Sequence, residues 1–482
     1  MTFNSFLFLL VFLPVVLIVY WILRGQGRYS LSVKFLTLAS VIFYGINYPK
    51  GLPILLASLI LNYLWAVCIL KSGRKALLVA GVTFDVLLLA IFKYGSLLIP
   101  FIGTTITAPC ISFYSFCEIA LLFECYRGTV NSISVTEYSF LMTFFPKMLE
   151  GPIVRPNDLL PQTSQLIAMD ADGSKIKAFD WDRAWRMLLL FSMGLFKKVI
   201  LAEVLGKAVD YGFTNLNVLH SGEALVVMLS YTLQLYFDFS GYSDMAIAIA
   251  ALLGFDIPIN FNSPYKAKNI CDFWDRWHIS LTTFFTRYLY IPLGGNRKGK
   301  TRMYINFLIV FFISGLWHGS GLQFIIWGMM HGVLFLITRV IVDSKIKVRI
   351  PQFVKCLITF LYVNVAWVFF RAPSVDDAVH LFSDMAQCWF PRFNIGLAKC
   401  FNMDELWYVL KILHLTSYEY SLYILMVAIL VFALVVVFVF PTAIKYVNTC
   451  RVNFANTALM TILMVWSILS FEGVATYIYV NF

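Results

Sequence analysis

The chain has 482 residues, of which 60% are hydrophobic and 13% charged, and its formal net charge is +11. Soluble domains carry about 25% charged residues, and one globular core cannot bury this much apolar surface. The composition therefore excludes an ordinary soluble protein and predicts a polytopic membrane protein. The positive charge does not predict nucleic-acid binding, because the basic residues stand in short clusters beside apolar runs, as they do in cytoplasmic loops. These clusters are Arg24/Arg28, Lys71/Arg74/Lys75, Arg297/Lys298/Lys300/Arg302 and Lys345/Lys347/Arg349.

Four apolar runs open the chain, at 5–23, 31–47, 52–70 and 76–94. Each is long enough to cross a membrane as a helix. The first run has no basic segment before it and no small-residue cleavage site after it, so we expect a retained span rather than a signal peptide. Basic loops after the first and third runs place those ends in the cytoplasm, and the N-terminus is then expected outside.

Residues 95–165 differ from the first spans, because prolines and glycines break their apolar pieces into short lengths. Pieces this short predict re-entrant or half-spanning helices. Lys147, Glu150 and Arg155 surround a Gly-Pro break in this stretch. Two interpretations are open for these charges. They are either solvated side chains of an interfacial loop or a basic lip at the cytoplasmic mouth of a cavity.

A polar stretch at 166–181 predicts a cytoplasmic loop. An amphipathic helix is expected from 181 to 209, lying partly in the membrane interface, with Lys197 and Lys198 next to each other on it.

The nine cysteines are scattered, with no Cys-x-x-Cys pair and no cysteine–histidine spacing of a metal site. We therefore expect reduced thiols, no disulfides and no zinc or other metal.

Apolar runs at 222–237 and 245–254 flank a polar interruption that contains Asp238, Gly241 and Asp244. Two carboxylates at membrane depth are compatible with a general acid and base. The alternative is a structural role in a broken helix, with Gly241 and nearby serines supplying local hydrogen-bond partners.

The stretch 271–332 holds two histidines in an apolar setting. In a helix expected over 271–291, His278 falls on the apolar, inward face, while Asp272 and Arg276 are spaced to pair on another face. His318 closes an apolar run and precedes a glycine-rich break, where a substrate could approach its ring closely. An ionisable side chain beside a broken helix at membrane depth costs several kcal/mol, so it indicates a functional site.

Further apolar runs follow at 303–317, 322–341, 352–370, 422–440 and 455–471. Basic residues at 297–302, 345–349 and 445–451 place those loops inside, so residue 318 and the C-terminus are expected on the outer side. Residues 372–415 are amphipathic and predict an outer segment with short helices. About eleven spans result.

No loop typical of nucleotide hydrolysis or of a serine nucleophile is present. What remains is imidazole in a hydrophobic setting, which could take a proton from a hydroxyl or thiol as that group attacks an acyl carbonyl. Each histidine follows a tryptophan, Trp277 or Trp317, whose ring could line an acyl or pantetheine channel. The structural alternative for one such histidine is an interhelical hydrogen bond.

Segments along nearly the whole chain carry a likeness to a known family. They are the opening SFLFLLVFLPVVLIVYWIL, ISFYSFCEIALLFECYRG, FFPKMLEGPIVR, GLFKKVILAE, FDFSGYSDMAIAIAALLGFDIPINFNSPY, WDRWHISLTTFFTRYLYIPLGGNRKGK, LWHGSGLQFIIWGMMHG, WVFFRAPSVDDA and the terminal YIYVNF. They resemble the membrane-bound O-acyltransferase family, in its bacterial alginate O-acetyltransferase branch. YLYIPLGGNRKGK and LWHGSG together are the specific part of the likeness.

The resemblance implies one all-α domain, 1–482, in which about eleven transmembrane helices, with re-entrant and short helices, form a ring around a central funnel or tunnel. Residues 1–94 would be the N-terminal spans, 95–350 the catalytic core with the signature region 271–332, and 351–482 the C-terminal spans.

The resemblance also implies the activity. An O-acyltransferase of the bacterial inner membrane would move acetyl groups from a cytoplasmic thioester, acetyl-CoA or an acyl carrier protein, towards an exported polysaccharide. Alginate is the favoured acceptor, with peptidoglycan or cellulose as alternatives. We expect no bound cofactor, and as partners the donor, membrane lipid and periplasmic acetyltransferase- or esterase-like proteins. A transporter or flippase would need repeat symmetry and charges in several spans, which are not seen. A non-catalytic scaffold is a third alternative.

Matched by motif, His318 resembles the principal catalytic histidine of the family and His278 its second functional histidine. His331 also matches a family histidine, but we expect it to be structural. The substrate-binding residues that we expect are Trp277 and Trp317 for the acyl group and, because the donors are acidic, Arg297, Lys298, Lys147 and Arg155 for the donor. The chain departs from the family pattern at Asp275, at Thr286-Arg287 and at Glu150, which puts local salt-bridge partners in doubt.

Overall fold

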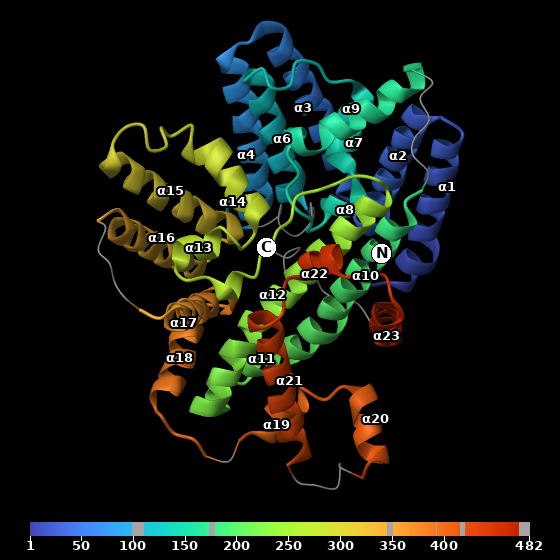
Figure 1. Cartoon of the computed structure of the whole chain (residues 1–482). Helices are drawn as coiled ribbons and strands as arrows, with labels where there is room; N and C mark the ends of the chain where they lie inside the picture. The colour runs from blue at the N-terminus through green and yellow to red at the C-terminus, as the bar shows by residue number, and fades with distance from the viewer. Residues whose placement is uncertain (99–109, 173–178, 345–349, 392, 415–419, 472–482) are drawn as a thin grey trace.

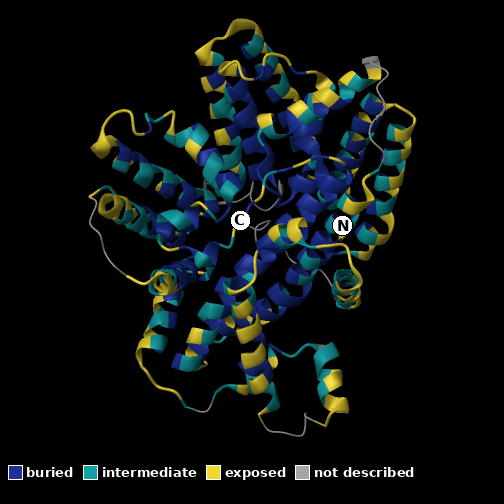
Figure 2. Ribbon diagram, viewed as in Figure 1, coloured by how far each residue is buried: buried dark blue, intermediate teal, exposed yellow. Residues whose placement is uncertain are grey.

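The structure is a computed structural model that describes residues 1–98, 110–172, 179–344, 350–391, 393–414 and 420–471. These residues form helices joined by turns and loops, and none of them lies in a β-strand. Figure 1 shows the helices in groups around a central region that α10 (Trp181–Phe196) and α12 (Ser221–Leu252) cross. Buried residues concentrate in this centre and exposed residues at the periphery (Figure 2). The predicted all-α class is confirmed.

The first four helices confirm the four predicted N-terminal spans. After a π-helical turn over Phe8–Phe12 they are α1 (Leu13–Gly25), α2 (Tyr29–Asn47), α3 (Leu52–Ser72) and α4 (Lys75–Leu98). Among the described residues, seven helices are long and apolar enough to cross a membrane, and these four belong to them. The other three are α16 (Leu322–Asp343), α17 (Gln352–Arg371) and α21 (Ser421–Phe438).

Two helices expected to span are outside this group of seven. They are α15 (Lys300–His318) and the shorter apolar α23 (Phe454–Leu469). The sequence estimate of about eleven spans counted them, together with the two runs that now form α12. With seven such helices, the chain is a multi-pass membrane protein.

The short pieces predicted between 95 and 165 are present as helices of 4 to 17 residues. They are α6 (Ile111–Tyr126), α7 (Val135–Thr143), α8 (Phe145–Met148) and α9 (Pro156–Asp172). Almost every residue of α6 is buried, because the helix packs against both α3 and α4. The prediction of a loop over 166–181 is wrong for residues 166–172, because α9 continues to Asp172.

The amphipathic helix predicted over 181–209 is present, and its two adjacent lysines are buried. It consists of α10, a π-helical turn over Lys197–Ala202 and α11 (Glu203–Thr214). Lys197 and Lys198 are only 8% and 4% exposed. The Nζ atom of Lys197 lies 2.6 Å from Oδ2 of Asp244, and Lys198 pairs with Asp238 in the same way. The two lysines are therefore buried ion-pair partners, and the interfacial position of the helix stays a prediction.

The prediction of a broken helix at Asp238 to Asp244 is also wrong, because α12 is continuous from Ser221 to Leu252. Lysines from the neighbouring helix neutralise both carboxylates, so α12 needs no local break to satisfy them. Two glycines allow α10 and α12 to approach each other closely. A Cβ on Gly194 or on Gly241 would lie 2.7 Å from the carbonyl oxygen of the other, so only glycine fits at this crossing.

The continuous helix predicted over 271–291 is broken in the structure. It is replaced by α13 (Ile270–Trp274), α14 (Ile279–Phe285) and a π-helical turn over Thr286–Tyr290. The break falls at His278, whose φ of 43° lies in the left-handed region. The predicted pairing is present between α13 and the turn that follows it, because Nε of Arg276 lies 2.6 Å from Oδ1 of Asp272.

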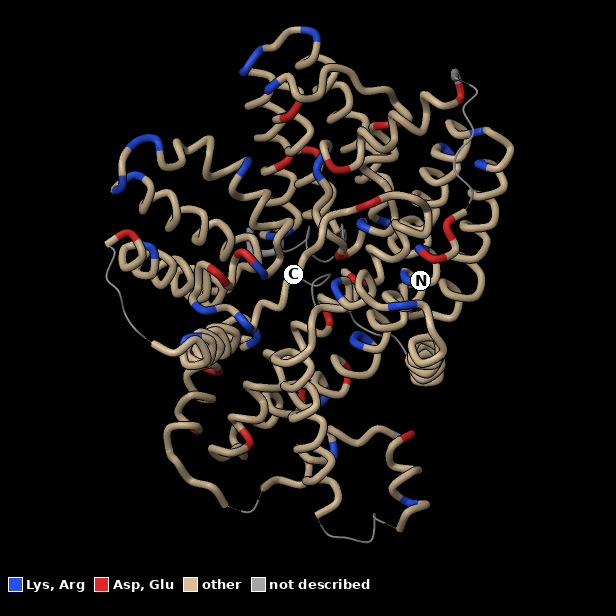
Figure 3. The backbone as a smooth tube through the Cα atoms, viewed as in Figure 1, with Lys and Arg blue, Asp and Glu red and all other residues tan. Residues whose placement is uncertain are grey.

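The remaining described helices complete the domain. They are α18 (Val375–Ala386), α19 (Ile395–Lys399), α20 (Asp404–Ile412) and α22 (Ala443–Thr449), with 3-10 turns at Leu216–Val218 and Pro264–Lys266. The short helices expected over 372–415 are confirmed, whereas the terminal YIYVNF lies outside the described residues. Figure 3 shows basic residues gathered at the α3–α4 connection and in the loop before α15, both at the edge of the molecule.

Candidate functional site

His318 is the last residue of α15 and is only 3% exposed. Three aromatic rings surround its imidazole, with centroids 4.5 Å away for Trp317, 4.9 Å for Trp327 and 4.8 Å for Phe370. Trp327 belongs to α16 and Phe370 to α17, so three helices meet at this histidine. Such a site excludes water and surrounds the imidazole with apolar contacts.

Glycines determine how α15 and α16 meet beside His318. A Cβ on Gly315 would lie 2.5 Å from the carbonyl oxygen of Phe324, and one on Gly328 would lie 2.5 Å from that of Phe311. The two backbones can therefore approach only because these positions carry no side chain. At Gly319 the space of a Cβ is filled by the ring of Phe324, 2.2 Å away. The glycine after the histidine thus allows a packing contact, and not the open approach for a substrate that the sequence suggested.

His278 lies in the turn between α13 and α14 and is 1% exposed. The ring of Phe239 meets its imidazole edge to face, with the centroids 4.7 Å apart. Neither ring nitrogen has a hydrogen-bond partner among the described residues. A buried polar atom without a partner costs roughly 1 to 3 kcal/mol, so a hydrogen bond from this imidazole to a group that enters the site would be favourable.

A chain of tryptophan rings connects the two histidines. Trp277, the neighbour of His278, lies 5.0 Å from Trp367, Trp367 lies 5.7 Å from Trp327, and Trp327 borders His318. Trp327 and Trp367 stack with an interplanar angle of 19°. The structure thus brings together both predicted histidines and Trp277 in one buried aromatic cluster. Sequence reasoning did not single out Trp327 or Trp367.

The second predicted tryptophan, Trp317, borders His318 and also contacts α4 and α6. Its Nε1 donates to Oγ of Ser112 at 3.1 Å, its ring lies 5.3 Å from Phe116, and the ammonium group of Lys93 lies 5.2 Å above it. Ser112 and Phe116 belong to α6 and Lys93 to α4, and Tyr94 of α4 also donates to the Leu316 carbonyl. These two helices therefore cover the end of α15.

His331 is fully buried in the same cluster. Its ring lies 5.1 Å from both Trp274 and Trp327, and its nitrogens have no hydrogen-bond partner among the described residues. Trp327 therefore touches both His318 and His331. The spacing of Trp327 and His331, four residues apart on α16, was the sequence signal that could have placed this tryptophan beside the site.

The four basic residues expected to bind the donor are in different environments. Lys147 is 4% exposed, and its Nζ donates to Sγ of Cys117 at 3.2 Å, so it is neither a solvated charge nor part of a surface. Arg155 is partly exposed and makes a two-bond ion pair with Asp158, at 2.7 and 3.0 Å. Arg297 and Lys298 are exposed, in a loop where Gly294, Gly295 and Gly299 have φ values of 109°, 54° and 88°.

The departures from the family pattern are in different surroundings. Arg287 holds Glu124 with two hydrogen bonds of 2.7 and 2.8 Å, and Tyr288 adds a third at 2.8 Å. Asp275 is exposed, whereas Glu150 is completely buried. The doubt about salt-bridge partners is therefore resolved for Arg287.

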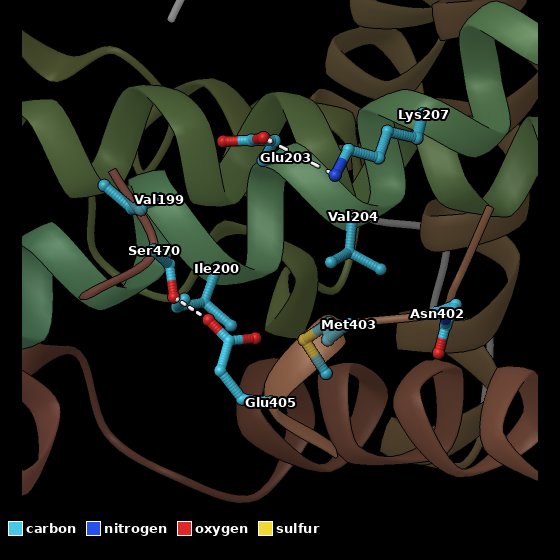
Figure 4. Close-up of a pocket in the computed structure, with 9 residues that line it drawn as sticks. All are labelled: Val199, Ile200, Glu203, Val204, Lys207, Asn402, Met403, Glu405 and Ser470. Atoms are coloured by element: carbon cyan, nitrogen blue, oxygen red, sulfur yellow. Dashed lines mark hydrogen bonds and ion pairs between the residues drawn. The ribbon is translucent and has the colours of Figure 1, made fainter. Parts of the chain in front are cut away.

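A separate pocket of about 80 Å³ lies between α11 and the segment around α20 (Figure 4). Glu203 and Lys207 line one side of it, and Glu405, which accepts a hydrogen bond from Ser470, lines the other. None of the residues predicted for the site lines this pocket. Among the described residues, no group of three or more histidine, cysteine, aspartate or glutamate side chains could hold a metal ion.

The helices define a multi-pass membrane protein, and its buried aromatic–histidine cluster lies inside the helical domain. The model of the MBOAT, membrane-bound O-acyltransferase, family matches residues 9–373. Since this match covers most of the chain, the protein belongs to the membrane-bound O-acyltransferase family and is an O-acyltransferase.

Curated relatives support the assignment. The peptidoglycan O-acetyltransferase of Helicobacter pylori is 36% identical over 425 residues, with 80% of this chain and 79% of that protein covered. The protein named probable alginate O-acetylase AlgI of Pseudomonas aeruginosa is 35% identical over 406 residues, with 80% and 75% covered. The teichoic acid D-alanyltransferase of Bacillus subtilis is 28% identical over 236 residues, with 46% and 57% covered.

Proposed function

We propose that this O-acyltransferase moves acetyl groups from a cytoplasmic thioester, acetyl-CoA or an acyl carrier protein, towards a polysaccharide exported from the cell, and that it works in the inner membrane of a bacterium. The observation that carries the proposal is the buried cluster in which tryptophan rings connect His278 and His318. The relatives named as O-acetyltransferases support the acetyl group.

In the proposed reaction His318 is the general base. The oxygen of an acceptor hydroxyl bonds to the thioester carbonyl carbon, the carbon–sulfur bond breaks, and the hydroxyl proton passes through the imidazole to the departing sulfur. His278 assists from the other end of the tryptophan chain. Trp277 and the rings around His318 exclude water, which would otherwise hydrolyse the thioester. Trp317 supports the site by anchoring the end of α15 to Ser112 of α6.

Alginate is the acceptor that we propose first, and peptidoglycan is a second candidate. Relatives named for each polymer have nearly equal identity to this chain, 35% and 36%. The fold alone does not choose between them, because function depends on the site and on the partners that present the polymer. Periplasmic acetyltransferase- or esterase-like proteins would complete the transfer outside the membrane.

The donor would dock at the loop between α14 and α15 and at the first turn of α15. Arg297, Lys298, Lys300 and Arg302 are all exposed there and have no acidic partner among the described residues. Both CoA and acyl carrier proteins are acidic, so this positive surface would attract them. Arg155 would contribute less, because Asp158 already neutralises it. Lys147 is buried, so we do not include it in the docking surface.

Mass spectrometry of cell-surface polysaccharides, with and without the gene, tests the function. We expect O-acetyl groups to disappear from alginate, or from peptidoglycan if that polymer is the acceptor. His318→Ala should reduce acetylation by roughly two to four orders of magnitude, the usual contribution of a general base, while the protein remains in the membrane. His278→Ala should lose most of the activity as well. Near-normal acetylation by a well-expressed His318→Ala protein would contradict the mechanism and favour a scaffold.

A further inference from the structure

Asn260 is a buried amide that holds the chain next to His278. The residue is 1% exposed and lies in the segment that follows α12. Its Oδ1 accepts hydrogen bonds from the hydroxyl of Ser280, at 2.6 Å, and from the backbone N–H of Ser280, at 3.4 Å. Its Nδ2 donates to Oγ of Ser243 on α12 at 3.2 Å. One side chain therefore ties the start of α14 to α12.

The backbone around Asn260 strengthens the same connection. The amide of Ile279 donates to the carbonyl of Asn260 at 3.0 Å, and the amide of Asn262 donates to the carbonyl of Arg276 at 3.0 Å. The segment 260–262 thus runs beside 276–279 and holds it on both sides of His278.

His278 needs such support because its backbone is in a costly conformation. Its φ of 43° and ψ of 54° are left-handed, and a residue other than glycine pays of order 1 to 3 kcal/mol for this region. The conformation persists only if the surrounding contacts determine it. It turns the chain sharply between α13 and α14 and thereby sets the direction of the imidazole.

Ser280 extends the connection to the segment after α8, outside the signature region. Its hydroxyl, which donates to Asn260, also accepts the backbone N–H of Ile153 at 2.9 Å. Ile153 follows the Gly-Pro break at 151–152, which was noted in the sequence for its charges. The hydroxyl of Ser280 therefore joins three segments, and the Asn260 amide fixes its direction.

We infer that Asn260 is a positioning residue of the acyl transfer, because it holds His278 in the left-handed turn through Ser280. This inference rests on the proposed function for its catalytic consequence, but the positioning itself does not depend on which acyl group is transferred. Asn260 touches no reacting atom. It acts on the rate by keeping the imidazole in place, and a misplacement of about 1 Å can cost on the order of 100-fold in rate.

Asn260→Ala is the first test, with Asn262→Ala as its matched control. The Asn262 side chain is exposed and makes no hydrogen bond among the described residues, although its backbone belongs to the same segment. Carbethoxylation by diethyl pyrocarbonate, followed by mass spectrometry, reports how accessible each histidine is. We expect His278 to react several-fold faster in Asn260→Ala, while the rate at His331 stays unchanged. No change at His278 in a folded Asn260→Ala protein would overturn the inference.

The second measurement is the rate of acetyl transfer. It is made on membranes that contain the full chain, with acetyl-CoA as the donor. Asn260→Ala should lower kcat about 10- to 100-fold with little change in KM, since the docking loop is untouched. In a His278→Ala background it should add less than about 2-fold, because the residue acts through that histidine. An equal further loss in that background would show a merely structural role.

Ser280 provides the conservative rescue. Ser280→Ala should reproduce the effects of Asn260→Ala on kcat and on the reactivity of His278, whereas Ser280→Thr should restore both because it keeps the hydroxyl. If the wild-type protein transfers no acetyl group while His278 still becomes more reactive in Asn260→Ala, the proposed function fails and the positioning stands. If acetyl transfer is normal in Asn260→Ala, the positioning role fails and the function stands.

Discussion

Three buried histidines in this protein have different surroundings, and for this reason we propose different roles for them. His318 ends a helix where α15, α16 and α17 meet, and His278 occupies a strained turn. His331 lies inside a regular helix, with Trp274 and Trp327 against its ring. A side chain at a helix end or turn can meet an entering substrate, whereas one within a helix and enclosed by rings fills space.

We predict that His331→Ala costs stability more than turnover. Removing a completely buried ring leaves a cavity between Trp274 and Trp327, and comparable large-to-small changes cost about 3 kcal/mol. Thermal unfolding of the detergent-solubilised protein should show a lower midpoint, with acetylation per folded molecule retained. His331→Phe, which refills the space, is the matched control and should recover most of the midpoint. A well-folded His331→Ala protein without activity would instead place this histidine in the reaction.

At the scale of elements, the crossing of α10 and α12 stabilises the centre of the domain. Gly194 and Gly241 allow the backbones to touch, and the buried pairs Lys197–Asp244 and Lys198–Asp238 follow on the same side. Charges inside a membrane protein are costly unless paired, so each lysine determines where its aspartate can lie. In the π-helical turn over Lys197–Ala202, the backbone hydrogen bonds span one residue more than in an α-helix. This shift brings two consecutive lysines to the same partner helix, α12.

We predict that this ion pair is structural. Lys197→Met or Asp244→Leu alone should destabilise the protein by about 3 kcal/mol, because each leaves an uncompensated buried charge. The double variant should recover much of that loss, since two apolar side chains can pack where the pair was. Thermal unfolding of the three variants measures the coupling. If the double variant folds as well as wild type but transfers no acetyl group, the pair takes part in catalysis.

The loop between α14 and α15 is the second element with a testable role. We predict that Arg297→Glu with Lys298→Glu weakens donor binding and reduces its dependence on salt, because both exposed charges attract an acidic donor. Titration of acetyl-CoA or an acyl carrier protein at low and moderate ionic strength measures this effect. Arg155→Glu is a comparison variant and should have a smaller effect, since Asp158 already pairs with Arg155. Unchanged binding at low salt would contradict docking at this loop.

At the scale of the whole molecule, the distribution of charge predicts how the chain sits in the membrane. Basic residues concentrate in loops at the periphery, where Figure 3 shows them at the α3–α4 connection and before α15. The excess of lysine and arginine in such loops places them in the cytoplasm. The segment 372–415, with α18, α19 and α20, would then lie outside.

We predict that Cys388 reacts with an impermeant thiol reagent in intact cells, because it is exposed and belongs to this outer segment. In a Cys388→Ser background, Lys300→Cys should react only after the membrane is permeabilised. Position 300 is a better probe than the neighbouring Gly299, whose φ of 88° would strain a cysteine. Reaction of Lys300→Cys in intact cells would reverse the predicted orientation.

The sequence by itself determined the membrane class and the four N-terminal spans, and it predicted that His278, His318 and Trp277 belong to the site. Hydrophobic length, charge clusters and short motifs are local signals. They predict structure correctly because the bilayer thickness and the need to satisfy backbone hydrogen bonds act on each segment separately. The sequence could not determine that α12 is continuous, that Lys147, Lys197 and Lys198 are buried, or that the 271–291 helix breaks at His278. Each of these depends on partners far along the chain, such as Asp244 for Lys197 and Asn260 for the turn at His278. Only the tertiary structure decided them, because a charge or a strained turn is stable inside the protein only when distant residues compensate its cost.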